Sequence, residues 1–152
     1  MKGTLFIVAT PIGNLDDITF RAVEILKSID IVLAEDTRHS KKLLKHLNIT
    51  KPIRAFHEHN EREKTHASID ELHSGKSIAL ISDAGTPLIS DPGYFLVAQA
   101  KKEDLRVVPI PGASALITAL SASGLASDSF TFLGFLPSRQ AARIKLLKTL
   151  LN

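Results

Sequence analysis

The stretch that decides the fold spans residues 82–93 and reads SDAGTPLISDPG. It follows the apolar run SIALI at residues 77–81, which predicts a buried strand, and it precedes a helical pattern from Tyr94 to Lys102. The stretch is longer than the roughly 2–6 residues that usually connect a strand to a helix. Ligands of open parallel sheets bind outside the carboxyl ends of the strands, so this loop is a candidate binding site.

The alternative to a binding site is an ordinary connecting loop, because individual residues of this stretch have local roles that such a loop would also use. Gly85 can adopt a left-handed backbone and lets a ligand approach the main chain closely. Ser90 or Asp91 is expected to cap the following helix, with Pro92 at the first helical position.

The remainder of residues 1–124 repeats the order of strand, polar loop and helix. We expect further strands at residues 5–9, 31–34, 53–56 and 106–110. We expect one helix from a cap at Asp16 or Asp17 to residue 29, and others at 40–47, from a cap at Asn60 to 73, and from 111–115 to 123. Strands alternating with helices predict an α/β fold with an open parallel sheet, right-handed crossovers and helices on both faces.

The pattern changes after Gly124. Residues 126–129 read as a linker, and the aromatic alternation of FTFLGFL at 130–136 predicts a strand of a different sheet. Residues 137–152 predict a basic amphipathic helix with Ile144, Leu147 and Leu151 on one side. A lone strand and helix cannot bury their own apolar faces. We therefore expect an N-terminal α/β domain, residues 1–124, and a linker with the start of an incomplete second domain, residues 125–152.

The composition of the 152 residues excludes several classes of protein. Hydrophobic residues make up 44% and charged residues 23%, as is typical of a globular protein. The absence of Cys excludes disulfides and thiolate metal sites. No signal peptide and no stretch of about 18 apolar residues is found, so we expect a cytoplasmic protein. The net charge of +3 permits an anionic partner such as RNA.

Five polar loops lie at or near the ends of the expected strands, and together they predict the rim of a pocket. They span residues 10–14, 35–38, 57–60, 83–93 and 111–114. None contains the Walker pattern, the G-x-G-x-x-G dinucleotide pattern or the G-x-S-x-G nucleophile elbow. These absences argue against an NTPase and a Rossmann dehydrogenase, and they weaken the case for a serine hydrolase.

Four motifs follow one another in these loops: ATPIGNLDDI at residues 9–18, EDTR at 35–38, DAGTPLISDPG at 83–93 and PGASA at 111–115. Together they resemble the ribosomal RNA small-subunit methyltransferase I group of the tetrapyrrole methylase family. The resemblance implies an S-adenosylmethionine-dependent enzyme that methylates a cytidine ribose 2′-hydroxyl of small-subunit ribosomal RNA. It also implies a homodimer, and two α/β domains with the cofactor in the cleft between them, of which the second is nearly absent here.

The resemblance also implies cofactor contacts, transferred by motif position. They involve Pro11, Ala84, Gly85, Thr86, Ser90, Ser114 and Ala115. Small residues suit this place because an adenosine needs close approach to the backbone. The sulfonium of the cofactor is a cation that a nearby carboxylate would stabilise, and Asp83 is our candidate. The alternative for Asp83 is a structural role as a cap of its own loop.

Methylation of a ribose hydroxyl is helped by a general base, or by a cation near the oxygen. Among residues at strand ends, Asp36 of the EDTR motif is our first candidate for the base, followed by His57 and Glu58. The alternative for Asp36 is a structural ion pair with Arg38. The two histidines, His57 and His59, could be solvated loop residues, and without a third ligand in view we predict no metal site.

Basic side chains gather on two expected helices and could contact RNA phosphates, although a charged helix face is more often only solvated. They are Arg38, Lys41, Lys42, Lys45 and His46, and Arg139, Arg143, Lys145 and Lys148. Two alternatives to the RNA methyltransferase stay open. One is a methylase of a tetrapyrrole such as a corrin precursor, which the strongly polar loops disfavour. The other is a non-catalytic fragment that folds and dimerises.

Overall fold

The computed structural model describes residues 1–150, and within them one sheet holds five parallel strands. Their order across the sheet is β3 (Ile53–Ala55), β2 (Ile31–Ala34), β4 (Ile78–Ile81), β1 (Thr4–Val8) and β5 (Arg106–Ile110). The central strand β4 pairs with both β1 and β2, so that Leu5 and Ile31 each lie opposite Ile78. The predicted open parallel sheet is confirmed, and the carboxyl ends of its strands lie at one edge.

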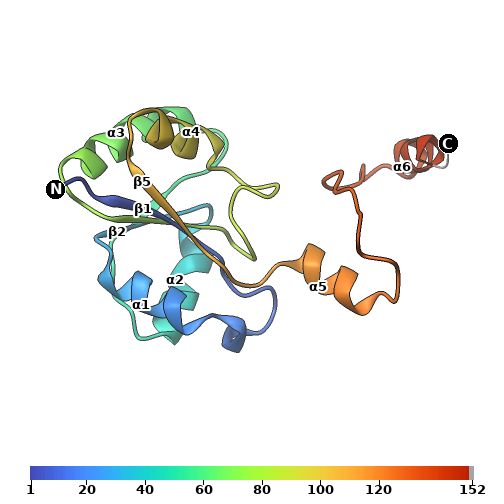
Figure 1. Ribbon diagram of the computed structural model, residues 1–152, viewed down its shortest axis with the longest axis horizontal. Coiled ribbons are helices and arrows are strands. Elements are labelled where there is room, and N and C mark those ends of the chain that lie inside the picture. Colours follow the sequence, from blue (N-terminus) through green and yellow to red (C-terminus); the bar gives the residue numbers. More distant parts are fainter. Residues whose placement is uncertain (151–152) are drawn as a thin grey trace.

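The helices of residues 1–150 divide into four that cover the sheet and two that do not. The helices are α1 (Phe20–Ser28), α2 (Thr37–His46), α3 (Glu61–His73), α4 (Tyr94–Lys102), α5 (Ala115–Ala122) and α6 (Gln140–Thr149). Figure 1 shows α3 and α4 on one face of the sheet and α1 and α2 on the other, with α5 and α6 leading away from it. The expected cover of helices on both faces is confirmed.

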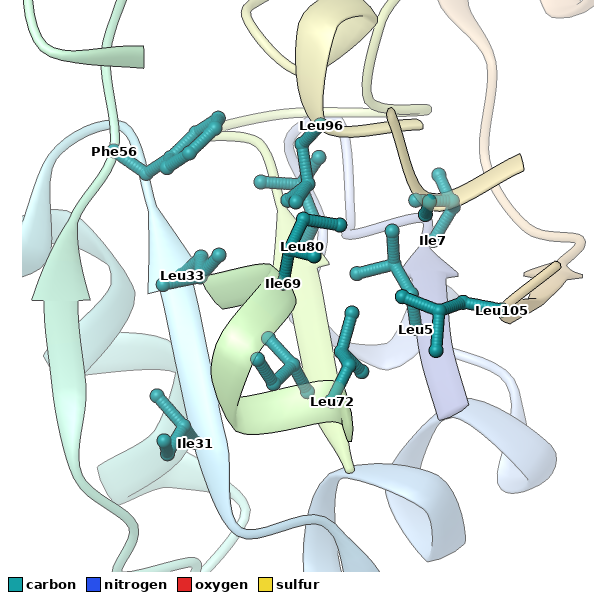
Figure 2. Packing of buried hydrophobic residues seen from close by; sticks show 12 residues of the cluster. Leu5, Ile7, Ile31, Leu33, Phe56, Ile69, Leu72, Leu80, Leu96 and Leu105 are labelled. Atoms are coloured by element: carbon teal, nitrogen blue, oxygen red, sulfur yellow. The ribbon is translucent and has the colours of Figure 1, made fainter. Parts of the chain in front are cut away.

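Two apolar layers hold these helices against the strands. On one face, Ile69 and Leu72 of α3 and Leu96 of α4 pack with Leu80 and Phe56, and Figure 2 shows these side chains gathered over the strands. A second cluster joins α1 and α2 to the opposite face. Its members include Val8, Ala22, Leu26, Val32, Leu44 and Ile81. Because β4 is covered on both faces, all of its residues are buried, which explains its uninterrupted apolar sequence.

The first helix begins later than the sequence predicts. A short 3-10 helix, η1 (Leu15–Asp17), precedes α1, and the Thr19 side chain caps α1 by accepting a hydrogen bond from the Ala22 amide at 3.1 Å. The expected cap at Asp16 or Asp17 is therefore wrong, because both carboxylates belong to the preceding 3-10 turn. The bounds of the other predicted elements of residues 1–124 agree with the structure to within three residues.

Residues 1–110, which we call the body, differ from residues 111–150, which we call the extension. The strand predicted at 130–136 is wrong: this segment has irregular backbone, and no other strand of the described chain lies beside it. Helix α6 forms inside the predicted range 137–152, of which Leu151 and Asn152 lie outside the described residues. No helix in residues 1–150 combines the length and the apolar character that a membrane crossing requires.

Candidate functional site

The loop that follows β4 is fastened to the loop that follows β1. The backbone N–H and C=O of Thr10 form hydrogen bonds with the C=O and N–H of Gly85, at 2.9 and 3.0 Å. The hydroxyl of Thr10 donates to the carbonyl of Ser82 at 3.0 Å, and the hydroxyl of Ser82 donates to the carbonyl of Gly85 at 3.0 Å. Gly85 has a φ of +83°, so the predicted need for a left-handed glycine is confirmed.

A cavity of about 340 Å³ opens beside this pair of loops. Six of the eight residues that the sequence assigns to the cofactor line it: Ala84, Gly85, Thr86, Ser90, Ser114 and Ala115. The Thr86 hydroxyl donates to the carbonyl of Ala113 at 3.3 Å and so joins the β4 loop to the loop after β5. Small residues from two loops therefore present backbone to one cavity, as an adenosine requires.

The other two predicted cofactor residues, Pro11 and Asp83, line a neighbouring hollow of about 430 Å³. This hollow and the cavity share Ile12 and Ala84, so all eight residues border one connected surface. The carboxylate of Asp83 accepts a hydrogen bond from the Asp36 amide at 3.2 Å. Asp83 thus links the β4 loop to the β2 loop, which is a structural contact beyond its own loop.

An acidic hollow of about 360 Å³ adjoins the cavity on another side, and the two share Ser90 and Asp91. Glu35, Glu58 and Glu61 also line it. Burial raises the pKa of the Glu35 carboxyl above its ordinary value, and the negative charges of Asp83 and Asp91 raise it further. Burial likewise raises the pKa of Asp91, partly offset by a hydrogen bond with Ser82. These carboxylates bind protons more readily than isolated ones do.

The last turn of the β4 loop is fixed by Glu61, a residue that the sequence analysis did not single out. The Glu61 side chain is buried, and one of its oxygens accepts hydrogen bonds from the amides of Gly93 and Phe95, both at 2.9 Å. This carboxylate therefore accepts hydrogen bonds from two of the free amides at the start of α4. The predicted cap at Ser90 or Asp91 is wrong, because neither side chain makes this contact and the capping position is Gly93.

The same loop contains backbone strain close to the cavity. Leu88 and Ser90 have φ values of +73° and +67°, which side chains with a Cβ rarely adopt. Gly93 has a φ of +132°, and a Cβ at its position would lie 2.6 Å from the Cδ2 atom of Leu80. Contacts of the loop with β4 and α3 therefore stabilise a conformation that its local preferences disfavour.

The three predicted catalytic residues lie in different surroundings. Asp36 caps α2 by accepting the Arg38 amide at 2.7 Å, which explains why this helix begins at residue 37. Its carboxylate also forms an ion pair with the Arg38 guanidinium at 3.3 Å, and hydrogen bonds from Arg38 hold the pKa of Asp36 below its ordinary value. The ion pair that the sequence offered as an alternative role for Asp36 is therefore present.

His57 is half-buried and is oriented by Asn60. The Nε2 atom of His57 lies 3.2 Å from the Asn60 amide nitrogen, and Asn60 also accepts the His57 amide at 2.9 Å. The His57 Nδ1 atom is buried and has no hydrogen-bond partner within the part of the chain that the structure describes. Of the three predicted residues, Glu58 alone is among the described residues that line the hollows above.

Comparisons with known proteins show the family to which the chain belongs. A family model described as tetrapyrrole (corrin/porphyrin) methylases matches residues 4–152. The chain is 57% identical over 150 residues to the ribosomal RNA small subunit methyltransferase I of Pasteurella multocida, covering 99% of this chain and 53% of that protein. It is 60% identical over 143 residues to the protein of the same name from Haemophilus influenzae, covering 94% of this chain and 50% of that protein.

The same comparisons extend to solved structures and to chain length. A uroporphyrin-III-C-methyltransferase from Thermus thermophilus shares the fold with a TM-score of 0.64 at 22% identity, over 83% of this chain and 55% of that chain. The present chain spans about half the length of the curated relatives it matches. The resemblance read from the four loop motifs is confirmed by these matches.

Proposed function

We propose, from the premise that this chain belongs to the tetrapyrrole (corrin/porphyrin) methylases, that it binds S-adenosylmethionine for transfer of a methyl group to RNA. The proposed acceptor is a cytidine ribose 2′-hydroxyl of small-subunit ribosomal RNA, in keeping with the names of the relatives. The observation that carries the proposal is the single cavity that collects Gly85 and Thr86 from one loop and Ser114 and Ala115 from another.

The residues around the cavity fit a nucleoside with a sulfonium. Gly85 and Ala84 would give the adenosine access to backbone groups, and the apolar side chains of Ile12, Phe132 and Phe135 would cover its rings. Asp83 is the proposed carboxylate near the sulfonium. When bound, the cofactor would supply an electrophilic methyl group on a positively charged sulfur. The chain itself would align the acceptor oxygen with that methyl group and exclude water from it.

The first candidate for the general base is Glu58 of the acidic hollow, ahead of Asp36 and His57, which do not line that hollow. Glu58 lines the hollow next to the cavity, whereas the oxygens of Asp36 are engaged by Arg38. Glu35 joins the candidates, since a carboxyl with a raised pKa accepts a proton more readily near neutral pH. Replacing the carboxylate that acts as the base by its amide should lower kcat by about 10²- to 10⁴-fold. The same replacement at the other candidate carboxylates should leave kcat near the wild-type value.

The test is transfer of a labelled methyl group from S-adenosylmethionine to small ribosomal subunits that lack this modification. A uroporphyrinogen acceptor, assayed in parallel, separates RNA methylation from tetrapyrrole methylation. The full-length Haemophilus influenzae relative serves as the positive control, because this chain spans half of its length. Label in the RNA and not in the porphyrinoid supports the proposal. A homodimer and a cytoplasmic location belong to the same proposal, and sedimentation of the purified chain tests the first.

A further inference from the structure

The exposed face of α2 carries a stripe of positive charge. Lys41, Lys42 and Lys45 follow Arg38 at intervals of three, four and seven residues, which places all four on one side of a helix. The buried residues of α2, Ser40, Leu43 and Leu44, lie on the opposite side. Residues 37–54 contain six Lys and Arg and no Asp or Glu, although the whole chain has a net charge of only +3. Positive charge is therefore concentrated on this segment.

This arrangement does not stabilise the helix that carries it. Like charges three and four residues apart cost a helix a few tenths of a kcal/mol for each pair, roughly 0.2–0.5. Arg38 is neutralised in part by Asp36, but Lys41, Lys42 and Lys45 make no ion pair with any carboxylate of residues 1–150. On α3, by contrast, acidic and basic residues both occur in the first turn, where Glu63 pairs with Lys64.

The stripe leads into a groove of about 480 Å³ between the end of α2 and the edge strand β3. Lys41, Lys45 and Lys51 line its rim together with the polar side chains of Asn48 and Thr50. No carboxylate lines it among the described residues, and its floor is apolar. A groove with three ammonium groups and two neutral hydrogen-bonding side chains matches an anionic, hydrogen-bonding chain such as a phosphate backbone.

We propose that the exposed face of α2 and this groove bind the phosphate backbone of the RNA substrate, an inference that rests on the proposed RNA methyltransferase function. Helix α2 begins at the edge of the sheet where the cavity opens, and from Arg38 to Lys45 it runs about 10 Å at 1.5 Å per residue. Helix α2 can therefore bind the part of the RNA strand that extends away from the cavity. Lysine contacts to phosphate fix the position of the RNA and carry no base preference.

The test compares two triple variants of the chain that lose the same charge. K41Q/K42Q/K45Q removes the three lysines of the stripe, and K27Q/K101Q/K102Q removes three exposed lysines from α1 and α4. Binding of a fluorescent single-stranded fragment of small-subunit ribosomal RNA is measured by anisotropy over a range of salt concentrations, without cofactor. Thermal unfolding confirms that both variants fold, and titration with S-adenosylmethionine measures the cofactor site separately.

The stripe variant should bind the RNA on the order of 10- to 100-fold more weakly at 0.1 M salt, with a salt slope reduced by up to about 2. The control variant should bind like the wild type. Equal weakening of both variants, or wild-type affinity in the stripe variant, overturns the inference and leaves the methyl-transfer proposal standing. Binding of the stripe to anionic phospholipid vesicles in preference to RNA overturns it too. Absent cofactor binding with intact RNA binding would instead contradict the proposed function alone.

Discussion

The body and the extension use similar apolar sequences in opposite ways. In residues 1–110 the runs of Ile, Leu and Val are buried in two layers, and every strand has a neighbour within the chain. In residues 111–150 no residue is buried, and large side chains such as Phe130, Leu133 and Phe135 are exposed. Figure 1 shows α5 and α6 leading away from the sheet.

The difference teaches that an apolar pattern specifies an element only where the chain also supplies its partner. The strand predicted at 130–136 has a suitable sequence but no strand to pair with among residues 1–150. Helix formation needs no such partner for its hydrogen bonds, and α6 forms with none of its residues buried. The body should therefore set the stability of the chain, while the extension contributes its residues to the cavity.

The largest expected effect separates the two regions by one substitution in each. Phe56→Ala removes a fully buried ring from the α3 side of the sheet and should lower the free energy of unfolding by about 3–5 kcal/mol. Phe135→Ala removes an exposed ring from the extension and should change it by less than about 0.5 kcal/mol. Urea unfolding followed by circular dichroism measures both. Similar losses in the two variants would show that the extension packs on the body.

A smaller effect is expected for the contact between α3 and the end of the loop that follows β4. Glu61→Ala leaves the amides of Gly93 and Phe95 without their acceptor and should cost about 2–3 kcal/mol. Glu63→Ala, two residues along the same helix, removes only a surface ion pair with Lys64 and should cost less than about 1 kcal/mol. The same unfolding experiment compares the two, and equal costs would mean that the buried contact does not anchor α4.

Glycine substitutions compare backbone strain in the two regions. Gly93→Ala places a methyl group against Leu80 at a positive φ, so the unfolding free energy should fall by about 1–3 kcal/mol. Gly124→Ala is also placed at a positive φ, but nothing lies within 4 Å of its Cβ. Because no residue of the extension is buried, we expect it not to share the cooperative unfolding of the body, so Gly124→Ala should move that transition by less than about 0.5 kcal/mol. A large shift would contradict this independence.

The smallest expected effect concerns pH and the acidic hollow. The pKa of Glu35 is raised in the folded state, so its protonated form favours folding at acid pH and this contribution is lost as the pH rises through the folded pKa. Glu35→Gln should therefore unfold at a slightly higher temperature than the wild type at pH 7 and at nearly the same temperature at pH 3. The difference at pH 7 should be small, because the Glu35 side chain is exposed and water screens its charge. Calorimetry at both pH values provides the measurement. A variant that is less stable at pH 7 would contradict the cost of burying the Glu35 charge and its repulsion with Asp83 and Asp91.

Most of the body could be predicted from the sequence because its signals are local. The apolar runs of the strands, the turn residues between them and the left-handed Gly85 all act within a few residues of themselves. The polar loops also predicted the rim of a pocket, since the carboxyl ends of parallel strands meet at one edge, and the resemblance supplied the individual residues around it. The absent strand at 130–136 could not be foreseen, because pairing depends on segments elsewhere.

The contacts that fix the site were not visible in the sequence. Glu61 reads as an ordinary acidic residue in the first turn of a helix, and its bond to Gly93 spans 32 positions of the chain. Asp83 reaches the amide of Asp36 across 47 positions. No periodicity or turn signal encodes such a contact. From its sequence Asp36 could be read as a base or as the partner of Arg38 in a structural ion pair, and the structure shows its bonds to Arg38.

The central claim is that loops from separate strands form one cavity for S-adenosylmethionine, and isothermal titration with this cofactor tests it most directly. Three proteins are compared: the wild-type chain, Ala84→Trp, which fills the cavity from its rim, and Ala67→Trp, which adds the same bulk at an exposed position of α3 that does not line the cavity. The account predicts binding heat for the wild type and Ala67→Trp and none for Ala84→Trp. Wild-type binding by Ala84→Trp, or no heat from the wild type at millimolar cofactor, would contradict it.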